Sequence, residues 1–265
     1  MNRIDQLFKD LQERKRKAFV SYLVAGDPHL DKTPELVDTL EKSGSDLIEL
    51  GVPFSDPLAD GIVNQLGSQR ALDSGTTLEG IFQAVQTIRQ KSEIPIVLFT
   101  YYNPIYHYGL QKFIAKAEKA GVDGALILDF PPEEAKSEWP ESTSLKRISL
   151  IAPTTPPNRI AKITSSSSGF IYYVSREGVT GMQDSLPKNI TEQIQEIRKT
   201  TKLPICVGFG ISTPEQAQVV AQAAEGVVVG SAIVNKIAKN LTNQNLLQEV
   251  ENFVTPLTQA THQNC

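Results

Sequence analysis

Short hydrophobic runs recur along the chain, and longer segments of mixed polarity separate them. The runs are nearly continuous in Val, Ile and Leu rather than alternating with polar residues, which is typical of parallel strands buried on both faces. Eight such runs predict eight strands, at Ala18–Ala25, Asp46–Leu50, Ile94–Thr100, Gly124–Leu128, Arg147–Ile151, Phe170–Val174, Leu203–Val207 and Gly226–Val229.

The segments between the runs show the spacing of amphipathic helices. They predict helices at Thr33–Ser43, Leu78–Lys91, Leu110–Ala120, Ile190–Lys199 and Pro214–Ala223. A further amphipathic helix is predicted within Met1–Lys17, where Ile4, Leu7, Phe8 and Leu11 share one face.

Eight strand–helix units in about 250 residues predict an α/β fold, a (β/α)8 TIM barrel with an extra N-terminal helix. We expect residues 1–265 to form a single domain, because no linker interrupts the pattern. The alternative is a doubly wound open sheet, although Ala25-Gly-Asp-Pro28 stands where a dinucleotide fold would place its glycine-rich turn. The polar tail Thr255–Cys265 is expected to be a frayed end.

Charge and cysteine content narrow the class of partner and the compartment. The net charge is -4 with both signs mixed along the chain, which argues against nucleic acid or an anionic membrane as the main partner. Only Cys206 and Cys265 occur, so we expect no disulfide framework and a reducing, cytoplasmic location. No hydrophobic run is long enough to span a bilayer, and the first residues lack a signal-peptide core.

One carboxylate interrupts the second hydrophobic run. Glu49 lies between Ile48 and Leu50, and the following loop carries Asp56 and Asp60. Burying a charge among hydrophobic residues is costly, so Glu49 is a candidate catalytic group. The alternative is that Glu49 lies on the solvent-exposed face of an edge strand.

Small residues follow the last two predicted strands, at Gly208-Phe-Gly210 and Gly230-Ser231. In a barrel these turns meet at the carboxyl-terminal face, and a short helix starting near Ser231 would point its first amides there. The pattern predicts a phosphate site made by backbone donors, whereas the alternative is a pair of tight turns. After strand six, Ser175–Gly181 reads either as a lid hinged at Gly178 and Gly181 or as an ordinary surface loop.

The three histidines support neither a metal site nor nucleophilic catalysis. His29, His107 and His262 lie in three unrelated segments without ligand spacing, and none suits a Ser-His-Asp arrangement. Carboxylates and a phosphate anchor remain, and this combination suits general acid/base catalysis on a phosphorylated substrate without a cofactor.

The segment Ile48-Glu-Leu-Gly-Val-Pro-Phe-Ser-Asp-Pro-Leu-Ala-Asp-Gly61 resembles the signature of the tryptophan synthase alpha subunit family. Other segments resemble the family in the same order, from the first helix to the last: Phe19–Pro28, Tyr102–Pro104, Tyr172–Gly181, Val207–Ile211 and Val229–Val234. The long signature is highly specific, whereas many phosphate-binding barrels share the glycine turns.

The resemblance implies retro-aldol cleavage of indole-3-glycerol phosphate to indole and glyceraldehyde 3-phosphate. Glu49 matches the family's acid/base carboxylate, and its hydrophobic strand is expected to raise its pKa. Asp60 matches the second catalytic carboxylate, which binds the indole N–H and is expected to stay ionised in its polar loop. The remaining matches are Tyr22 and Tyr172 in the indole pocket, Thr180 on the lid, and Gly210, Gly230 and Ser231 at the phosphate, with Gly208 and Phe209 beside them.

The resemblance also implies a partner, a beta subunit that carries pyridoxal phosphate and forms an alpha2-beta2 heterotetramer with this chain, which itself needs no cofactor. One stretch departs from the family. Where the family usually reads Pro-Val-Ile-Gln, this chain reads Ile62-Val-Asn-Gln65, so it lacks a proline just after the catalytic loop. A free-standing lyase of the same fold and a catalytically silent, phosphate-binding regulatory barrel remain alternatives.

Overall fold

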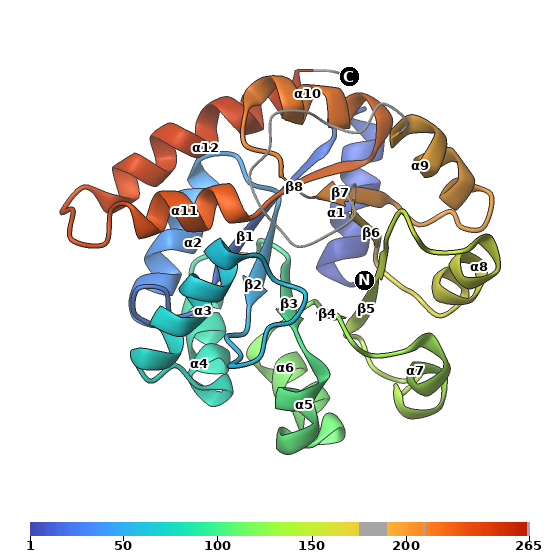
Figure 1. Cartoon of the computed structure of the whole chain (residues 1–265), viewed down its shortest axis with the longest axis horizontal. Helices are drawn as coiled ribbons and strands as arrows, with labels where there is room; N and C mark the ends of the chain where they lie inside the picture. The colour runs from blue at the N-terminus through green and yellow to red at the C-terminus, as the bar shows by residue number, and fades with distance from the viewer. Residues whose placement is uncertain (175–189, 209, 264–265) are drawn as a thin grey trace.

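A closed ring of eight parallel strands forms the centre of the molecule, and helices surround it (Figure 1). The computed structural model describes residues 1–174, 190–208 and 210–263. Each strand pairs in parallel with its sequence neighbour, and β1 closes the ring against β8. This confirms the TIM barrel, and the doubly wound open sheet is wrong.

The strands lie close to the predicted runs. They are β1 (Ala18–Val24), β2 (Leu47–Gly51), β3 (Ile96–Thr100), β4 (Gly124–Ile127), β5 (Lys146–Ile151), β6 (Ile171–Val174), β7 (Ile205–Gly208) and β8 (Gly226–Val229). Most of their residues are buried, because helices cover the outer face and side chains fill the interior.

The described helices include all those predicted and several more. They are α1 (Arg3–Glu13), α2 (Lys32–Lys42), α3 (Ile62–Asp73), α4 (Leu78–Arg89), α5 (Tyr102–Tyr108), α6 (Leu110–Ala120), α7 (Pro132–Glu138), α8 (Pro157–Ser165), α9 (Ile190–Arg198), α10 (Pro214–Ala223), α11 (Ser231–Ala238) and α12 (Leu246–His262).

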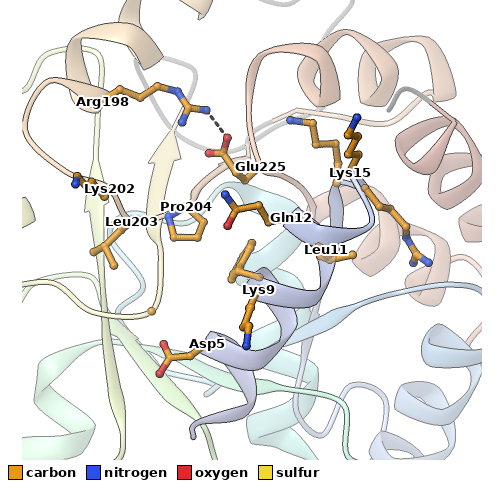
Figure 2. A pocket seen from close by; sticks show the side chains of 14 residues that line it. Asp5, Lys9, Leu11, Gln12, Lys15, Arg198, Lys202, Leu203, Pro204 and Glu225 are labelled. Carbon is orange, nitrogen blue, oxygen red and sulfur yellow. Dashed lines mark hydrogen bonds and ion pairs between the residues drawn. The ribbon is translucent and has the colours of Figure 1, made fainter.

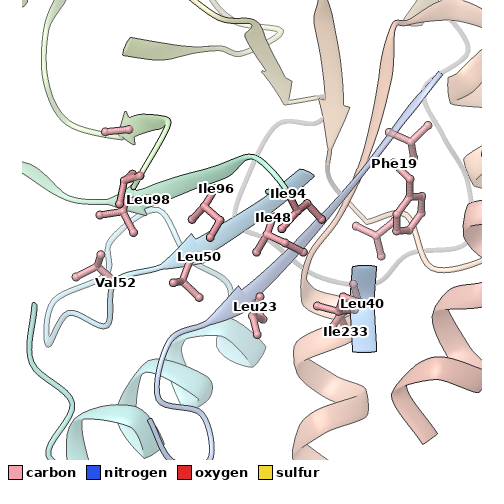
Figure 3. Close-up of a cluster of buried hydrophobic side chains, with 14 of the residues drawn as sticks. Phe19, Leu23, Leu40, Ile48, Leu50, Val52, Ile94, Ile96, Leu98 and Ile233 are labelled. Atoms are coloured by element: carbon pink, nitrogen blue, oxygen red, sulfur yellow. The ribbon is translucent and has the colours of Figure 1, made fainter. Parts of the chain in front are cut away.

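Alternation along each strand divides the core into two shells. Outward-facing residues such as Phe19, Ile48 and Leu98 pack under the helices, and Figure 3 shows them over the first three strands. The intervening residues, such as Val20, Leu47 and Val97, fill the barrel interior. Because Glu49 follows Ile48 by one residue, its side chain belongs to the inner shell.

Helix α1 covers the amino-terminal end of the barrel. Its buried residues Ile4, Phe8 and Leu11 pack with the inner shell, as the predicted amphipathic face required. The side chain of Asn2 caps the helix by accepting from the Ile4 N–H at 2.8 Å, and its amide donates to the Asp123 and Ser144 carbonyls. The cap therefore fastens α1 to the loop that precedes β4 and to the segment before β5.

The expectation of a frayed tail from Thr255 is wrong up to His262, because α12 continues to that residue. Thr258 and Thr261 are buried, and the Thr258 hydroxyl donates to the Ser43 carbonyl at 2.6 Å. Threonine hydroxyls that bond backbone carbonyls can enter a core, so polar composition alone was a poor guide here. Cys265 lies outside the described residues.

Candidate active site

The carboxyl-terminal ends of the strands surround a small cavity. Both the predicted acid/base residue Glu49 and residues of the predicted phosphate turns line it. Its volume is about 40 Å³, and it is lined by Tyr22, Glu49, Asn64, Phe99, Tyr172, Gly210, Gly230 and Ser231. Six of these eight residues were predicted from sequence.

Glu49 occupies the inner face of β2, in register with Tyr22 on β1 and Val97 on β3. The residue is completely buried, so its placement on a solvent-exposed edge is wrong. Neither carboxyl oxygen has a hydrogen-bond partner among the described residues. Burial without a compensating partner raises the pKa of Glu49 to about 8, so the carboxyl holds its proton at neutral pH.

Asp60 ends the loop that follows β2, and it is only 4% exposed. The polar loop is therefore not what favours its ionised form, and burial instead raises the pKa of Asp60. Hydrogen bonds from Tyr101 and Asn64 act in the opposite direction. The Tyr101 hydroxyl donates to Asp60 Oδ2 at 3.0 Å and accepts from the Ala59 N–H at 3.0 Å, which fixes the end of the loop.

Flat aromatic side chains make the walls between the two carboxylates. Tyr22 meets Phe99 edge to face, with ring centroids 5.2 Å apart. Burial strongly raises the pKa of Tyr22 and of Tyr172, and the nearby Asp60 and Glu49 carboxylates add to the effect. Both phenols therefore stay neutral, and the walls suit a flat apolar ring.

Three residues of the predicted phosphate turns, Gly210, Gly230 and Ser231, line the same cavity. Helix α11 begins at Ser231 as predicted, with Gly230 as its N-cap residue. The Ile233 and Val234 amides donate to the Gly230 carbonyl at 2.8 and 3.1 Å, which leaves the two amides before them, those of Ser231 and Ala232, without an intrahelical acceptor and available to an anion. Gly210 has φ +75°, a left-handed conformation that favours glycine. The amino-terminal end of α11 and Glu49 therefore line the same cavity.

Two of these glycines make room for aromatic side chains. A Cβ atom on Gly208 would lie 2.1 Å from the Tyr172 hydroxyl, and one on Gly230 would lie 3.2 Å from Tyr22 Cδ1. Gly208 does not line the cavity itself. In this structure the missing side chain of Gly208 leaves room for the Tyr172 ring, a role that the interpretation as a phosphate turn did not predict.

Thr180 and Phe209, together with the predicted lid Ser175–Gly181, lie outside the described residues. Three residues of the site were not predicted as such. Phe99 belongs to the inward-facing period of β3, Tyr101 follows that strand, and Asn64 stands in the stretch that departs from the family. The alternation of β3 could have identified Phe99, and the departure from the family sequence could have identified Asn64. The contact between Tyr101 and Asp60 joins residues 41 positions apart, so no local pattern indicated it.

A larger hollow of about 650 Å³ lies at the opposite end of the barrel, between α1 and the start of β7 (Figure 2). It is lined largely by charged side chains such as Lys9, Lys15 and Lys202, and an ion pair joins Arg198 to Glu225 across one wall. Barrel enzymes place their chemistry at the carboxyl-terminal face, so this hollow is not the candidate active site.

The described residues contain no group of three His, Cys, Asp or Glu side chains that could hold a metal ion. Nor does any helix among them have the length and hydrophobicity to cross a membrane.

Known proteins match the chain over nearly its whole length. The family model described as tryptophan synthase alpha chain matches residues 8–262. The tryptophan synthase alpha chain of Opitutus terrae is 51% identical over 243 residues, which cover 91% of each protein. That of Geotalea daltonii is 48% identical over 259 residues, which cover 97% of this chain and 98% of the relative.

Solved structures agree with the sequence relatives. Tryptophan synthase subunit alpha from Legionella pneumophila superposes with a TM-score of 0.88 at 36% identity, covering 98% of both chains. A chain of Mycobacterium tuberculosis tryptophan synthase gives a TM-score of 0.90 at 31% identity, again with 98% coverage of both.

Proposed function

This chain belongs to the tryptophan synthase alpha chain family, lyases that cleave indole-3-glycerol phosphate in tryptophan biosynthesis. We propose that Glu49 is its catalytic acid/base and that Asp60 is the second catalytic carboxylate, which stabilises positive charge on the substrate. One observation supports this assignment most strongly. Glu49 is a buried, protonated carboxyl without a hydrogen-bond partner among the described residues, and it shares a cavity with a helix N-terminus suited to phosphate.

The reaction follows from the positions of the two carboxylates. Glu49 delivers its proton to the indole ring carbon that bears the side chain, and the ring gains positive charge. Asp60 accepts a hydrogen bond from the indole N–H and stabilises that charge. The Glu49 carboxylate then takes the proton of the adjacent hydroxyl. The electron pair of the breaking carbon–carbon bond returns to the ring, which releases indole and glyceraldehyde 3-phosphate and leaves Glu49 protonated again.

The other site residues bind the substrate in this proposal. Tyr22 and Tyr172 contact the indole ring, while Gly210, Gly230 and Ser231 bind the phosphate through backbone amides, with Gly208 and Phe209 beside them. Thr180 closes over the site. No cofactor is required, because Glu49 makes the proton transfers and Asp60 stabilises the charge that forms on the ring.

An alpha chain implies a beta subunit as its partner. We propose an alpha2-beta2 heterotetramer in the cytoplasm, in which the beta subunit holds pyridoxal phosphate and consumes the indole. A stripe of exposed hydrophobic side chains beside the active site supports this contact. Leu58, Ile62 and Leu66 are spaced four residues apart and are 88%, 64% and 52% exposed. Such a stripe on the catalytic loop and α3 suits a protein partner.

Indole release from indole-3-glycerol phosphate tests the proposal, measured with and without a tryptophan synthase beta subunit. We expect slow release that rises strongly with the beta subunit. Glu49→Gln and Asp60→Asn should each lower kcat at least about 100-fold. Asp56→Asn is the matched control in the assay without the beta subunit, because Asp56 is exposed in the same loop and should keep wild-type activity there.

Three results would contradict parts of this proposal. Full activity of Glu49→Gln would exclude that carboxyl as the acid. Fast release without any partner would favour a free-standing lyase. If the wild type released no indole in either condition while binding phosphate ligands, the chain would be a regulatory barrel.

A further inference from the structure

Asn64 is a buried polar residue at a position where the family usually has an isoleucine. It lies in the first turn of α3, is 5% exposed, and lines the same cavity as Glu49. A buried side-chain amide is costly unless its donors and acceptor find partners. An exchange of a hydrocarbon for an amide at the wall of an active site therefore needs an explanation in terms of hydrogen bonds.

The donor half of this amide has a partner in the protein. Asn64 forms a side-chain hydrogen bond with Asp60, and this bond opposes the effect of burial on that carboxyl. Because an ionised carboxylate only accepts, the NH2 group of Asn64 must face Asp60. That orientation assigns the other end of the amide as the carbonyl oxygen.

The acceptor half has no protein partner among the residues that the structure describes. Asn64 Oδ1 is buried without a hydrogen bond among the described residues. The other buried side-chain atoms in this state are both carboxyl oxygens of Glu49, which line the same cavity, and Arg16 Nε. Three of these four atoms thus belong to residues of the cavity wall, so the missing partners are concentrated where the substrate would bind.

We propose that Asn64 is a substrate-binding residue whose Oδ1 accepts a hydrogen bond from a hydroxyl of the glycerol chain. This inference rests on the proposed function, in which Asp60 takes the indole N–H. Glu49 takes the proton of the hydroxyl adjacent to the ring, so the donor that remains on the substrate is the second chain hydroxyl. An isoleucine at this position could contact the substrate but could not accept this hydrogen bond.

The proposal makes Asn64 a determinant of specificity. A ligand that lacks the hydroxyls leaves the buried Oδ1 unpaired and is penalised. A hydrocarbon side chain at position 64 removes that penalty, so the site should then discriminate less between hydroxylated and deoxygenated chains. A role in packing alone would affect both ligands equally.

The test is a binding cycle in a Glu49→Gln background, which prevents turnover. Calorimetry gives Kd for indole-3-glycerol phosphate and for 3-(indol-3-yl)propyl phosphate, which is the substrate without its hydroxyls. We expect Asn64→Leu to reduce the preference for the hydroxylated ligand by about 10-fold or more. Ser68→Ala is the matched control, since Ser68 is buried one turn further along α3 but does not line the cavity.

Asn64→Ile provides a second variant, because it restores the residue usual in the family and should fold. An unchanged ligand preference in both variants would overturn the inference, and so would an equal loss of affinity for the two ligands. Failure of the proposed function gives a different pattern. In that case Glu49→Gln would still cleave the substrate, or the wild-type chain would not bind it.

Discussion

The two carboxylates of the candidate site differ in the hydrogen bonds that they accept from neighbouring side chains. Glu49 and Asp60 are both buried, and burial raises the pKa of each. Asp60 accepts from Tyr101 and Asn64, whereas Glu49 accepts from no described residue. Hydrogen bonds to the charged form favour ionisation, so the environment separates a proton donor from a charge stabiliser.

The raised pKa of Glu49 predicts how stability depends on pH. Between about pH 4.5 and pH 8 the folded protein keeps a proton that the unfolded chain releases, so the unfolding free energy falls as pH rises. Glu49→Gln carries no such proton. We expect it to exceed the wild type in unfolding free energy at pH 8.5 by several kcal/mol, about 1.4 kcal/mol per pKa unit, and to match it near pH 4.5.

Urea unfolding at a series of pH values measures this difference. Glu79→Gln is the control, because Glu79 is exposed and hydrogen bonds from Lys116 and Tyr108 lower the pKa of its carboxyl. Its difference from the wild type should have the opposite sign. Parallel pH profiles for Glu49→Gln and the wild type would show that Glu49 titrates normally in the folded protein.

At the scale of elements, α3 connects the catalytic loop to the barrel. The helix starts two residues after Asp60 and carries Asn64 in its first turn. Further along, Arg70 donates to both carboxylate oxygens of the fully buried Asp27, at 2.8 and 2.7 Å. This paired contact ties α3 to the loop after β1, so the position of the site depends on the whole helix.

Ile62 occupies the first position of α3, where the family usually has proline. The N–H of that position has no partner within the helix, and Gly61 is extended at φ -75° and ψ 165°, as a residue before proline requires. We therefore expect Ile62→Pro to raise the free energy of unfolding by about 0.4–1 kcal/mol.

Thermal unfolding of the isolated chain measures the effect, and Leu66→Pro, four residues further into the same helix, is the destabilising control. A lower melting temperature for Ile62→Pro would show that the Ile62 N–H or side chain makes a stabilising contact.

At the scale of the whole molecule, α1 is part of the barrel and not an appendage. Ile4 is fully buried near Gly124 and Gly169, where built Cβ atoms would lie 3.1 and 3.5 Å from it. Arg3 and Arg89 both pair with Asp123, at 3.0 and 2.8 Å, close to the same end. We propose that residues 1–265 form one domain that unfolds as a unit.

This proposal predicts that Ile4→Ala destabilises the entire barrel. We expect a loss of about 2–5 kcal/mol in a single urea transition, because the deletion opens a cavity in the inner shell. Lys9→Ala on the exposed face of α1 should change stability by less than about 0.5 kcal/mol. Equal stabilities of the two variants, or a separate early transition, would show that α1 folds independently of the barrel.

The sequence alone determined the architecture and the chemical class of the site. Continuous hydrophobic runs, amphipathic segments and turn glycines are local signals, and each reports which residues leave water. They located the eight strands, most of the surrounding helices, and the carboxylate Glu49 within a hydrophobic strand. The long signature from Ile48 to Gly61 then carried the family resemblance, which the family model matched over residues 8–262.

Only the tertiary structure decided the environments of these residues. Three features depend on segments that meet when the barrel closes: the burial of Asp60, its hydrogen bond from Tyr101, and the Asn64 oxygen that has no partner among the described residues. The same holds for the tail, whose threonines find carbonyl partners only in the packed chain. Solvation and hydrogen bonding are properties of three-dimensional neighbours. The pattern along the chain therefore named the reacting groups and predicted the raised pKa of Glu49, but it did not predict the burial and the hydrogen bonds of Asp60.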